Sequence, residues 1–286
     1  MRAPSRRKAL LHDVRAQRRR TLSTPANPHG PTQTSANPPT PSPSSRWLSD
    51  TKARIGRCIM FGVDSKHMGG GVGMCKILAK EWRELIAGRD GYLVADNRAG
   101  LLKQNVVWGE QDSMGHVNNV TYIRYAESAR VEWARKYALH MDPGHKKQWS
   151  ELWTSRGDGF ILRSIKTDFK FPMTWPDKVS VFHKLSSLPS PTDSHFNLDV
   201  LIVSERRQRV AARCEEDIVI YDYKKGKKVP LRPFMIEAFK KTWEEQEKEK
   251  SRVMERISNI DGALKGWEKQ TWDRSDAVED MGGNAQ

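Results

Sequence analysis

Apolar positions after residue 118 recur with the period of an α-helix. Spacings of four, three, four and four residues put Tyr122, Ala126, Ala129, Trp133 and Tyr137 on one helix face. No glycine or proline interrupts the pattern before Pro143. Asn118 or Asn119 can cap this helix, because a short amide side chain accepts a bond from first-turn N–H groups. The sequence therefore predicts a long helix with one buried face, and an ion pair between Glu132 and Lys136 on the other side.

Residues 159–223 show instead the two-residue alternation of β-strands. Four strands are predicted, at 159–171, 179–185, 196–202 and 210–221, and a shorter one ends at Val106-Val107-Trp108 before the helix. His183 keeps the phase of its apolar neighbours, and we interpret it as a structural histidine. Glu216 is also in phase with apolar positions, so either a bulge resets the register or the carboxylate points inward. A strand, a long helix and four further strands form an α+β arrangement.

Helical extensions are predicted on both sides of this region. Residues 47–100 contain two helical stretches, with a glycine-rich segment at 69–73 between them and a turn at 88–91 after the second. The glycines lack both the G-x-x-x-x-G-K-[ST] and the G-x-G-x-x-G order, so we interpret them as a flexible linker rather than a nucleotide site. Pro233 can begin a C-terminal helix within residues 233–286, with the apolar spacing of a packed or coiled-coil helix.

Charge is concentrated at the N-terminus. Of the net charge of +14, residues 1–49 contribute +8, from nine basic residues and one acidic residue. An Arg-rich, acid-poor start is typical of a mitochondrial transit peptide, and the Pro/Ser/Thr-rich segment after Arg20 is typical of a disordered linker. We therefore expect residues 1–46 to direct import into the mitochondrial matrix and to be removed. A nucleic-acid-binding arm is the less favoured interpretation, because no aromatic residues are interleaved with the basic ones.

Cysteine content and hydropathy argue against a disulfide-bonded protein, a metal-binding protein and a membrane-spanning protein. The three cysteines, at positions 58, 75 and 214, lie far apart and form no metal-ligand spacing, which favours reduced thiols inside a cell. No metal and no cofactor is predicted. No apolar run approaches the length of a membrane-spanning helix.

The loop before the long helix carries the residues best suited to chemistry. A helix N-terminus offers unpaired N–H donors and a partial positive charge, and the carboxylate of Asp112 lies a few residues upstream. A carbonyl bound at the helix end would be polarised while the carboxylate stood beside its carbon, as addition to a thioester or ester requires. The alternative is that Asp112 and the two asparagines are ordinary loop and cap residues.

The run Asp112-Ser113-Met114-Gly115-His116-Val117-Asn118-Asn119, followed by Tyr122 and by Glu127-Ser128-Ala129-Arg130, resembles a known signature. It is similar to that of the 4-hydroxybenzoyl-CoA-thioesterase-like branch of the hotdog-fold superfamily, and to its fungal type of mitochondrial thioesterase-like protein. The resemblance covers about residues 103–232. It implies a long central helix wrapped by an antiparallel sheet in a domain at 101–232. It also implies a site between two subunits. Glu110 departs from the family pattern, which commonly has an Asp there.

These observations lead to a hypothesis of an acyl-CoA or acyl-carrier thioester hydrolase acting in mitochondria. The resemblance makes Asp112 the base or nucleophile, with N–H groups near Asn119 to Tyr122 as the oxyanion site. His116 and Asn118 would position the loop or the substrate, and Glu127 on the helix is an alternative base. We expect a homodimer or a dimer of dimers, with no nucleic-acid partner. The alternative is a non-catalytic hotdog-fold protein with an assembly or RNA-associated role, which the long extensions favour.

Overall fold

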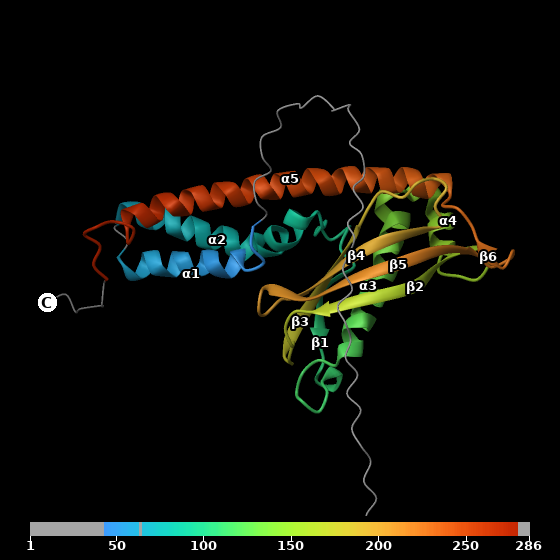
Figure 1. Cartoon of the computed structure of the whole chain (residues 1–286), viewed down its shortest axis with the longest axis horizontal. Coiled ribbons are helices and arrows are strands. Elements are labelled where there is room, and N and C mark those ends of the chain that lie inside the picture. The colour runs from blue at the N-terminus through green and yellow to red at the C-terminus, as the bar shows by residue number, and fades with distance from the viewer. Residues whose placement is uncertain (1–42, 63–64, 280–286) are drawn as a thin grey trace, which may run out of the picture. The chain divides into compact units, whose positions relative to one another are not determined.

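A single antiparallel sheet forms the centre of the computed structural model, which describes residues 43–62 and 65–279. Its strands run in the spatial order β1-β3-β4-β5-β2, and a short β6 pairs with β5 (Figure 1). The bounds are β1 Leu101–Val106, β2 Asp158–Phe169, β3 Asp177–Leu185, β4 His195–Ser204, β5 Arg209–Asp222 and β6 Lys227–Lys228. The four strands predicted after the long helix are confirmed. The predicted strand end at Trp108 is wrong, because β1 ends at Val106 and Trp108 begins a 3-10 turn.

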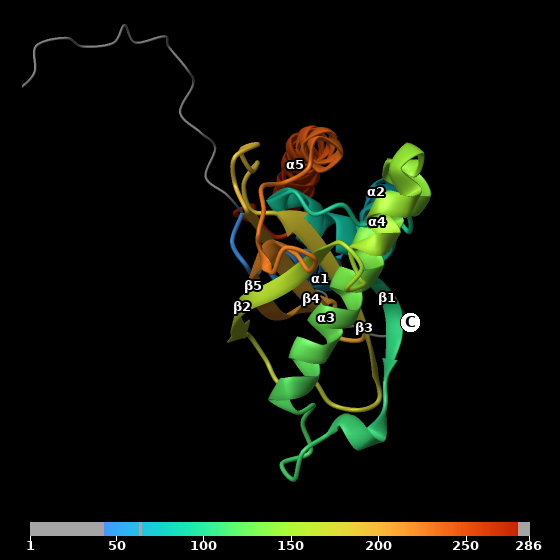
Figure 2. The same cartoon turned by 90° about the vertical axis from the view of Figure 1, so that its right-hand side faces the viewer.

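The long helix α3, Asn119–Lys136, packs on one face of this sheet. Figure 2 shows it in the curve of the sheet, with β1 on one side and β2 and β5 on the other. All five residues predicted for its inner face are buried. The two alanines, Ala126 and Ala129, bring the helix backbone close to its neighbours, and Gly100 leaves room for Ala129. A π-helical turn, Tyr137–Met141, ends the pattern before Pro143, and the short helix α4, Lys146–Glu151, follows. A long helix wrapped by an antiparallel sheet is the hotdog arrangement, so the predicted α+β fold is confirmed.

Three helices outside the central sheet and α3 pack against one another. They are α1, Trp47–Met60, α2, Ser65–Ala87, and α5, Pro233–Gln270. Their apolar faces form one core with the outward-pointing side chains of β3 and β4, among them Phe182, Leu201 and Val203. The first turns of α5 pack instead beside α3, where Phe239 contacts the aromatic cluster around Trp133. The C-terminal helix therefore joins the extension to the central domain. No helix in the described ranges has the length and apolar composition needed to span a membrane.

The glycine-rich stretch is not a linker, which corrects the prediction for residues 69–73. All four glycines lie inside α2. Gly71 faces the indole of Trp267 on α5, and a Cβ atom at this position would overlap the ring. The helix tolerates glycine here because packing against α5 compensates for its low helix propensity. The predicted turn at 88–91 is confirmed, since a 3-10 turn follows Ala87 and Gly91 has a φ of +88°.

The expected pair between Glu132 and Lys136 is not formed. Glu132 accepts a hydrogen bond from Arg135, at 2.9 Å. The ammonium group of Lys136 donates to the backbone carbonyls of Asp96 and Ala99, which lie in the segment leading to β1. Lys136 therefore binds backbone carbonyls and not the carboxylate of Glu132. The carboxylate of Glu132 is partly exposed, and a pair with it would add little stability.

Residues 1–42 lie outside the described residues. The predicted transit peptide and linker at 1–46 therefore stay predictions, as do the limits proposed for the domains.

Candidate active site

Asp112 lies in a tight loop between β1 and α3. Its backbone N–H donates to the carbonyl of His116, at 2.8 Å, and its carbonyl accepts from Gly115 N–H, at 3.0 Å. Gly115 has a φ of +75°, a conformation that glycine adopts without steric cost. The carboxylate atom Oδ1 of Asp112 accepts the N–H groups of Met114 and His116, at 2.9 and 3.3 Å. These bonds fix the exposed carboxylate and leave its second oxygen, Oδ2, without a partner among the described residues.

The N-terminus of α3 follows the Asp112 loop directly and begins with an asparagine cap. The side chain of Asn118 accepts the N–H of Val120, at 3.1 Å, and its carbonyl accepts the N–H of Thr121, at 2.9 Å. The cap is therefore Asn118, which decides between the two asparagines. Within the described chain, the N–H of Asn119 makes no hydrogen bond. A donor of this kind at a helix N-terminus suits an oxyanion.

Glu110 fastens the loop to the helix, a role that sequence reasoning missed. Its Oε2 accepts the hydroxyl of Tyr125, at 2.6 Å, and the N–H of Val107, at 2.9 Å. Its Oε1 accepts a guanidinium N–H of Arg124, at 2.6 Å. Burial, followed by the bond to this carboxylate, raises the pKa of Tyr125, so the phenol stays a donor. The two carboxylates of the loop thus differ: that of Glu110 is occupied, and that of Asp112 is open.

Two other predicted site residues have distinct environments. Tyr122 is buried, and its hydroxyl accepts the N–H of Met173, at 3.0 Å. Its ring also packs edge-on against Phe169, so its side chain supports the 169–173 segment, whereas its backbone lies in the first turn of α3. His116 is half-buried, and its imidazole makes no hydrogen bond to the described residues.

Glu127, the alternative base, is exposed on α3 about two turns after Asn119. Among the described residues, Glu127 forms no ion pair with Arg124 or Arg130. Arg124 pairs with Glu110, and Arg130 pairs with Glu216 inside the domain. Glu127 therefore has a solvated position, separate from the loop that holds Asp112.

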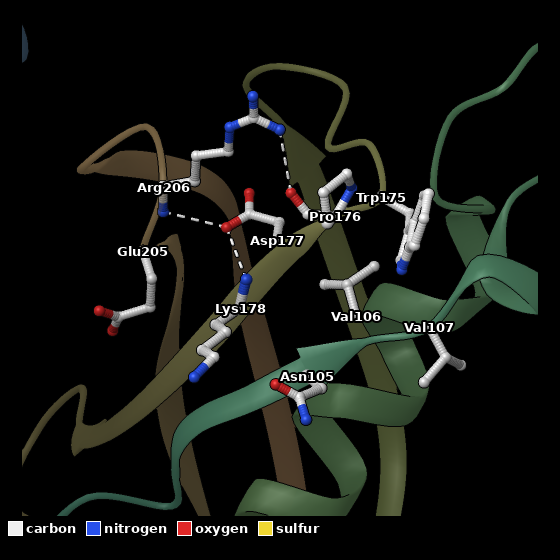
Figure 3. A pocket seen from close by; sticks show the side chains of 9 residues that line it. All are labelled: Asn105, Val106, Val107, Trp175, Pro176, Asp177, Lys178, Glu205 and Arg206. Carbon is white, nitrogen blue, oxygen red and sulfur yellow. Dashed lines mark hydrogen bonds between the residues drawn. The ribbon is translucent and has the colours of Figure 1, made fainter.

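A pocket of about 610 Å³ lies beside this loop, between the end of β1, the segment before β3 and the β4–β5 hairpin (Figure 3). Val107 and Trp175 form one side of it, and Asp177 and Arg206 form another. The backbone N–H of Trp175 donates to the side-chain oxygen of Gln111, at 3.0 Å, which connects the pocket wall to the loop. Asp112 itself is not among the lining residues.

Large apolar side chains are exposed on and around the same loop. Trp108 is 71% exposed and Met114 is 78% exposed, and Val107, Val120 and Trp175 are also exposed. Exposed apolar groups gathered near a polar site are typical of a surface that a ligand or another chain covers. The arrangement can therefore hold an apolar group next to a carboxylate and a free N–H donor. In the ranges that the structure describes, no cluster of three or more His, Cys, Asp or Glu residues could hold a metal ion.

Comparison with known families identifies the segment that contains this loop. Residues 106–239 match the family model of the thioesterase-like superfamily. This segment is similar to thioesterase-like proteins. It includes the Asp112 loop, α3 and strands β2 to β6, but not the helices before it or most of α5. The 4-hydroxybenzoyl-CoA branch and the fungal mitochondrial type stay predictions.

Solved structures of similar proteins cover about half of the chain. A thioesterase from Thermus thermophilus, solved with coenzyme A and zinc, is 22% identical over 49% of this chain and 91% of its own, with a TM-score of 0.39. A DHNA-CoA thioesterase from Staphylococcus aureus is 18% identical over 50% of this chain and 90% of its own, with a TM-score of 0.40. A search of curated protein sequences finds no match.

Proposed function

We propose that this protein hydrolyses the thioester of an acyl-CoA or an acyl-carrier protein, with Asp112 as the reacting carboxylate. The observation that carries the proposal is the pairing of two free groups in a thioesterase-like segment. The Oδ2 atom of Asp112 and the N–H of Asn119 both lack partners in the described chain, at opposite ends of one short loop.

The chemistry follows from these two groups. The thioester oxygen accepts the Asn119 N–H, and the charge that develops on it is stabilised at the helix N-terminus. In one route, Asp112 takes a proton from water, whose oxygen attacks the carbonyl carbon. The tetrahedral intermediate then collapses to a carboxylic acid, and the proton passes to the departing thiolate. In the other, Asp112 Oδ2 attacks the carbon directly, releases the thiolate and forms a mixed anhydride, which water cleaves.

The acyl group has an apolar surface available to it. Met114 lies in the loop, and Val120 lies in the first turn of α3. Trp108 precedes the loop, and all three side chains are exposed. Burial of an acyl chain against such side chains contributes about 0.8 kcal/mol per methylene group. We therefore expect affinity to increase with acyl length until the surface is filled.

A homodimer or a dimer of dimers would complete the site. Strand β2 pairs only with β5 among the described strands and presents a free edge, with Phe169 exposed at its end. An unpaired edge is a ready site for another strand. Light scattering at micromolar concentration should give at least a dimer, and a fully active monomer would refute this part of the proposal.

Mitochondrial action is proposed from residues 1–46, whose composition is Arg-rich and acid-poor. A reporter fused to this segment should enter mitochondria. A cytosolic or nuclear reporter would contradict the proposed location without affecting the proposed chemistry.

The test of function is hydrolysis of an acyl-CoA panel by the purified full chain and by Asp112→Asn. Asparagine keeps the Oδ1 atom that accepts two N–H groups, so the melting temperature should change little. It removes the charge and basicity, so the rate should fall on the order of a hundredfold or more. Glu127→Gln is the matched control, and it should stay within a few-fold of wild type.

The outcomes separate the two functions. Unchanged turnover in Asp112→Asn would refute the assignment of Asp112, and loss in Glu127→Gln alone would move the base onto α3. A folded wild-type protein that cleaves no CoA or carrier thioester would favour a non-catalytic assembly or RNA-associated role.

A further inference from the structure

A second cavity, of about 740 Å³, lies between the helical extension and the β4–β5 hairpin. One wall comes from the start of α1 and the end of α2, with Arg46, Lys52 and Arg89. These residues precede position 106, where the thioesterase-like segment begins. The cavity is therefore built in part by the extension, and it does not belong to the Asp112 site.

The opposite wall is also cationic. It carries Arg207 and Arg209 on the hairpin, Arg213 on β5 and Lys170 just after β2. No acidic residue is found among the described residues that line the cavity. The cations on the two facing walls repel one another, which is unfavourable in the folded chain. A bound anion would reduce this repulsion and stabilise the fold.

Carboxylates from outside the lining compensate some of this charge. Asp90 accepts a hydrogen bond from Arg213, at 2.6 Å, and lies 3.9 Å from the Nε atom of Arg89. At the exposed rim, Asp50 lies 3.7 Å from Arg46, and Asp168 lies 3.7 Å from Lys170. Exposed pairs at such distances are weak, because water and salt screen them.

Three other lining cations have no such neighbour. Within the described chain, no carboxylate lies within 4 Å of the charged groups of Lys52, Arg207 or Arg209. The ammonium group of Lys52 donates only to the neutral side chain of Gln208. Burial lowers the pKa of Lys52, as expected for an ammonium group that loses water without gaining a carboxylate. The cavity therefore keeps an excess of positive charge.

The shape of the cavity favours a small ligand. Arg89 is only 9% exposed, whereas Arg207, Arg209 and Lys170 are exposed. A phosphate group on a small molecule can enter between the walls, but the surface of a bilayer or a nucleic-acid helix can meet only the exposed cations. The volume also lies within the range of about 300–1,000 Å³ typical of small-molecule sites.

Apolar side chains complete the lining. Leu48 on α1 and Ile86 on α2 are buried, and Val210 on β5 is half-buried beside them. A ligand that carried anionic groups at one end and a planar or apolar body at the other would match both parts of the surface.

We propose that this cavity binds a small organic molecule with two or more linked phosphate groups, of the class of a nucleoside diphosphate. Adjacent phosphates can bridge the cations of the two walls, and guanidinium groups bind phosphate oxygens through paired N–H donors. A bound ligand would connect the helical extension to the β4–β5 hairpin. It should therefore raise the melting temperature of the whole chain.

The test is calorimetric titration of the full chain with ADP, inorganic pyrophosphate and inorganic phosphate at low ionic strength. We expect saturable binding, with ADP and pyrophosphate at least tenfold tighter than phosphate. The variant Lys52→Gln/Arg207→Gln/Arg209→Gln removes three cations that have no carboxylate partner. It should weaken ADP binding at least tenfold and abolish the rise in melting temperature.

The matched control is Arg156→Gln/Lys240→Gln/Lys241→Gln, which removes the same charge from exposed positions that do not line the cavity. It should bind ADP within about twofold of wild type. If the triple cavity variant fails to fold, Arg209→Gln alone should still weaken binding at least threefold, because Arg209 is exposed and its loss leaves no buried group unpaired.

Three results would overturn the proposal. The first is the absence of saturable ADP and pyrophosphate binding by the folded wild-type chain. The second is an equal loss of binding in the cavity and control variants, which would show only a general attraction to positive charge. The third is tighter binding of single-stranded RNA or of phosphatidylserine vesicles than of ADP through the same three cations, which would assign the surface to a macromolecular partner.

Discussion

Replacing one member of a buried ionic cluster should destabilise the central domain more than replacing two members together. Arg130 on α3 donates to Glu216 on β5, at 2.6 Å, and the Nε2 atom of His183 on β3 lies 3.5 Å from the other oxygen of Glu216. The side chains are 7% exposed for Arg130 and fully buried for the other two. The cluster therefore joins the central helix to two strands of the sheet.

The expected magnitude follows from this burial. Arg130→Met keeps most of the side-chain volume but leaves the Glu216 carboxylate without its cation in a site with no access to water. Breaking a buried ion pair from one side costs about 3–5 kcal/mol, whereas replacing both partners by apolar residues is often neutral or stabilising. The Arg130→Met/Glu216→Leu variant should thus recover most of the stability lost in the single variant.

Urea unfolding, followed by circular dichroism, measures both variants. With a slope of about 2 kcal/mol per molar urea, a loss of about 4 kcal/mol would lower the midpoint by about 2 M. The double variant should keep its midpoint within about 0.5 M of wild type and should still hydrolyse thioesters, because Arg130 lies about three turns along α3 from Asn119. A single variant within about 1 kcal/mol of wild type would refute the claim of an uncompensated buried charge. Equal destabilisation of single and double variants would show that packing, not charge, sets the cost.

Two further predictions use neighbouring residues as controls. Asn118→Ala removes the cap of α3 and should cost about 1 kcal/mol in urea unfolding, whereas Asn119→Ala, which keeps the backbone N–H, should leave stability nearly unchanged. Gly71→Ala places a Cβ atom against Trp267 and should destabilise by about 1–3 kcal/mol. Gly73→Ala meets nothing within 4 Å and should stabilise α2 by up to about 1 kcal/mol, so a melting temperature that rises in both variants would contradict the packing of α2 on α5.

The periodicity of apolar residues was sufficient to predict the helices and strands in which buried positions recur regularly. The inner face of α3 and strands β2 to β5 follow from apolar spacing, because the side chains that face the sheet–helix core recur with the period of each element. Glu216 marks the limit of this reasoning. Its phase allowed either a bulge or an inward carboxylate, and the choice depends on Arg130, which lies 86 residues away in the sequence.

Long-range partners also explain the error at the glycine-rich stretch and the position of a buried glutamine. Glycines in sequence are typical of a linker, but Gly71 lies in a helix because Trp267, nearly two hundred residues later, packs against it. Gln246 is a polar residue among the apolar positions of α5. In the fold it is buried, and its amide bonds both the N–H and the carbonyl of Leu185 at the end of β3. No local pattern contains these contacts.

The loop of the candidate site was easier to predict, because its bonds are local. Asp112 forms hydrogen bonds with residues no more than four positions away in the sequence. The cap residue Asn118 forms its capping bonds with residues no more than three positions further along the helix. The hydrogen bonds of Glu110 could not be predicted from the sequence, because its partners Arg124 and Tyr125 lie on α3. A departure from the family pattern at Glu110 was the available signal, and the longer side chain now has a structural reason.

The helical extension also limits how two copies can associate. Phe182, Leu201 and Val203 point away from α3, and side chains of α1, α2 and α5 cover them. A second sheet therefore cannot stack on this part of the outer face, and the charged pair between Arg163 and Asp217 disfavours apolar stacking on a neighbouring part. The free edge of β2 and the exposed side of α3 remain uncovered within the described chain. Because Glu127 lies on the exposed side of α3, a second copy that associates there would place its own residues beside this helix.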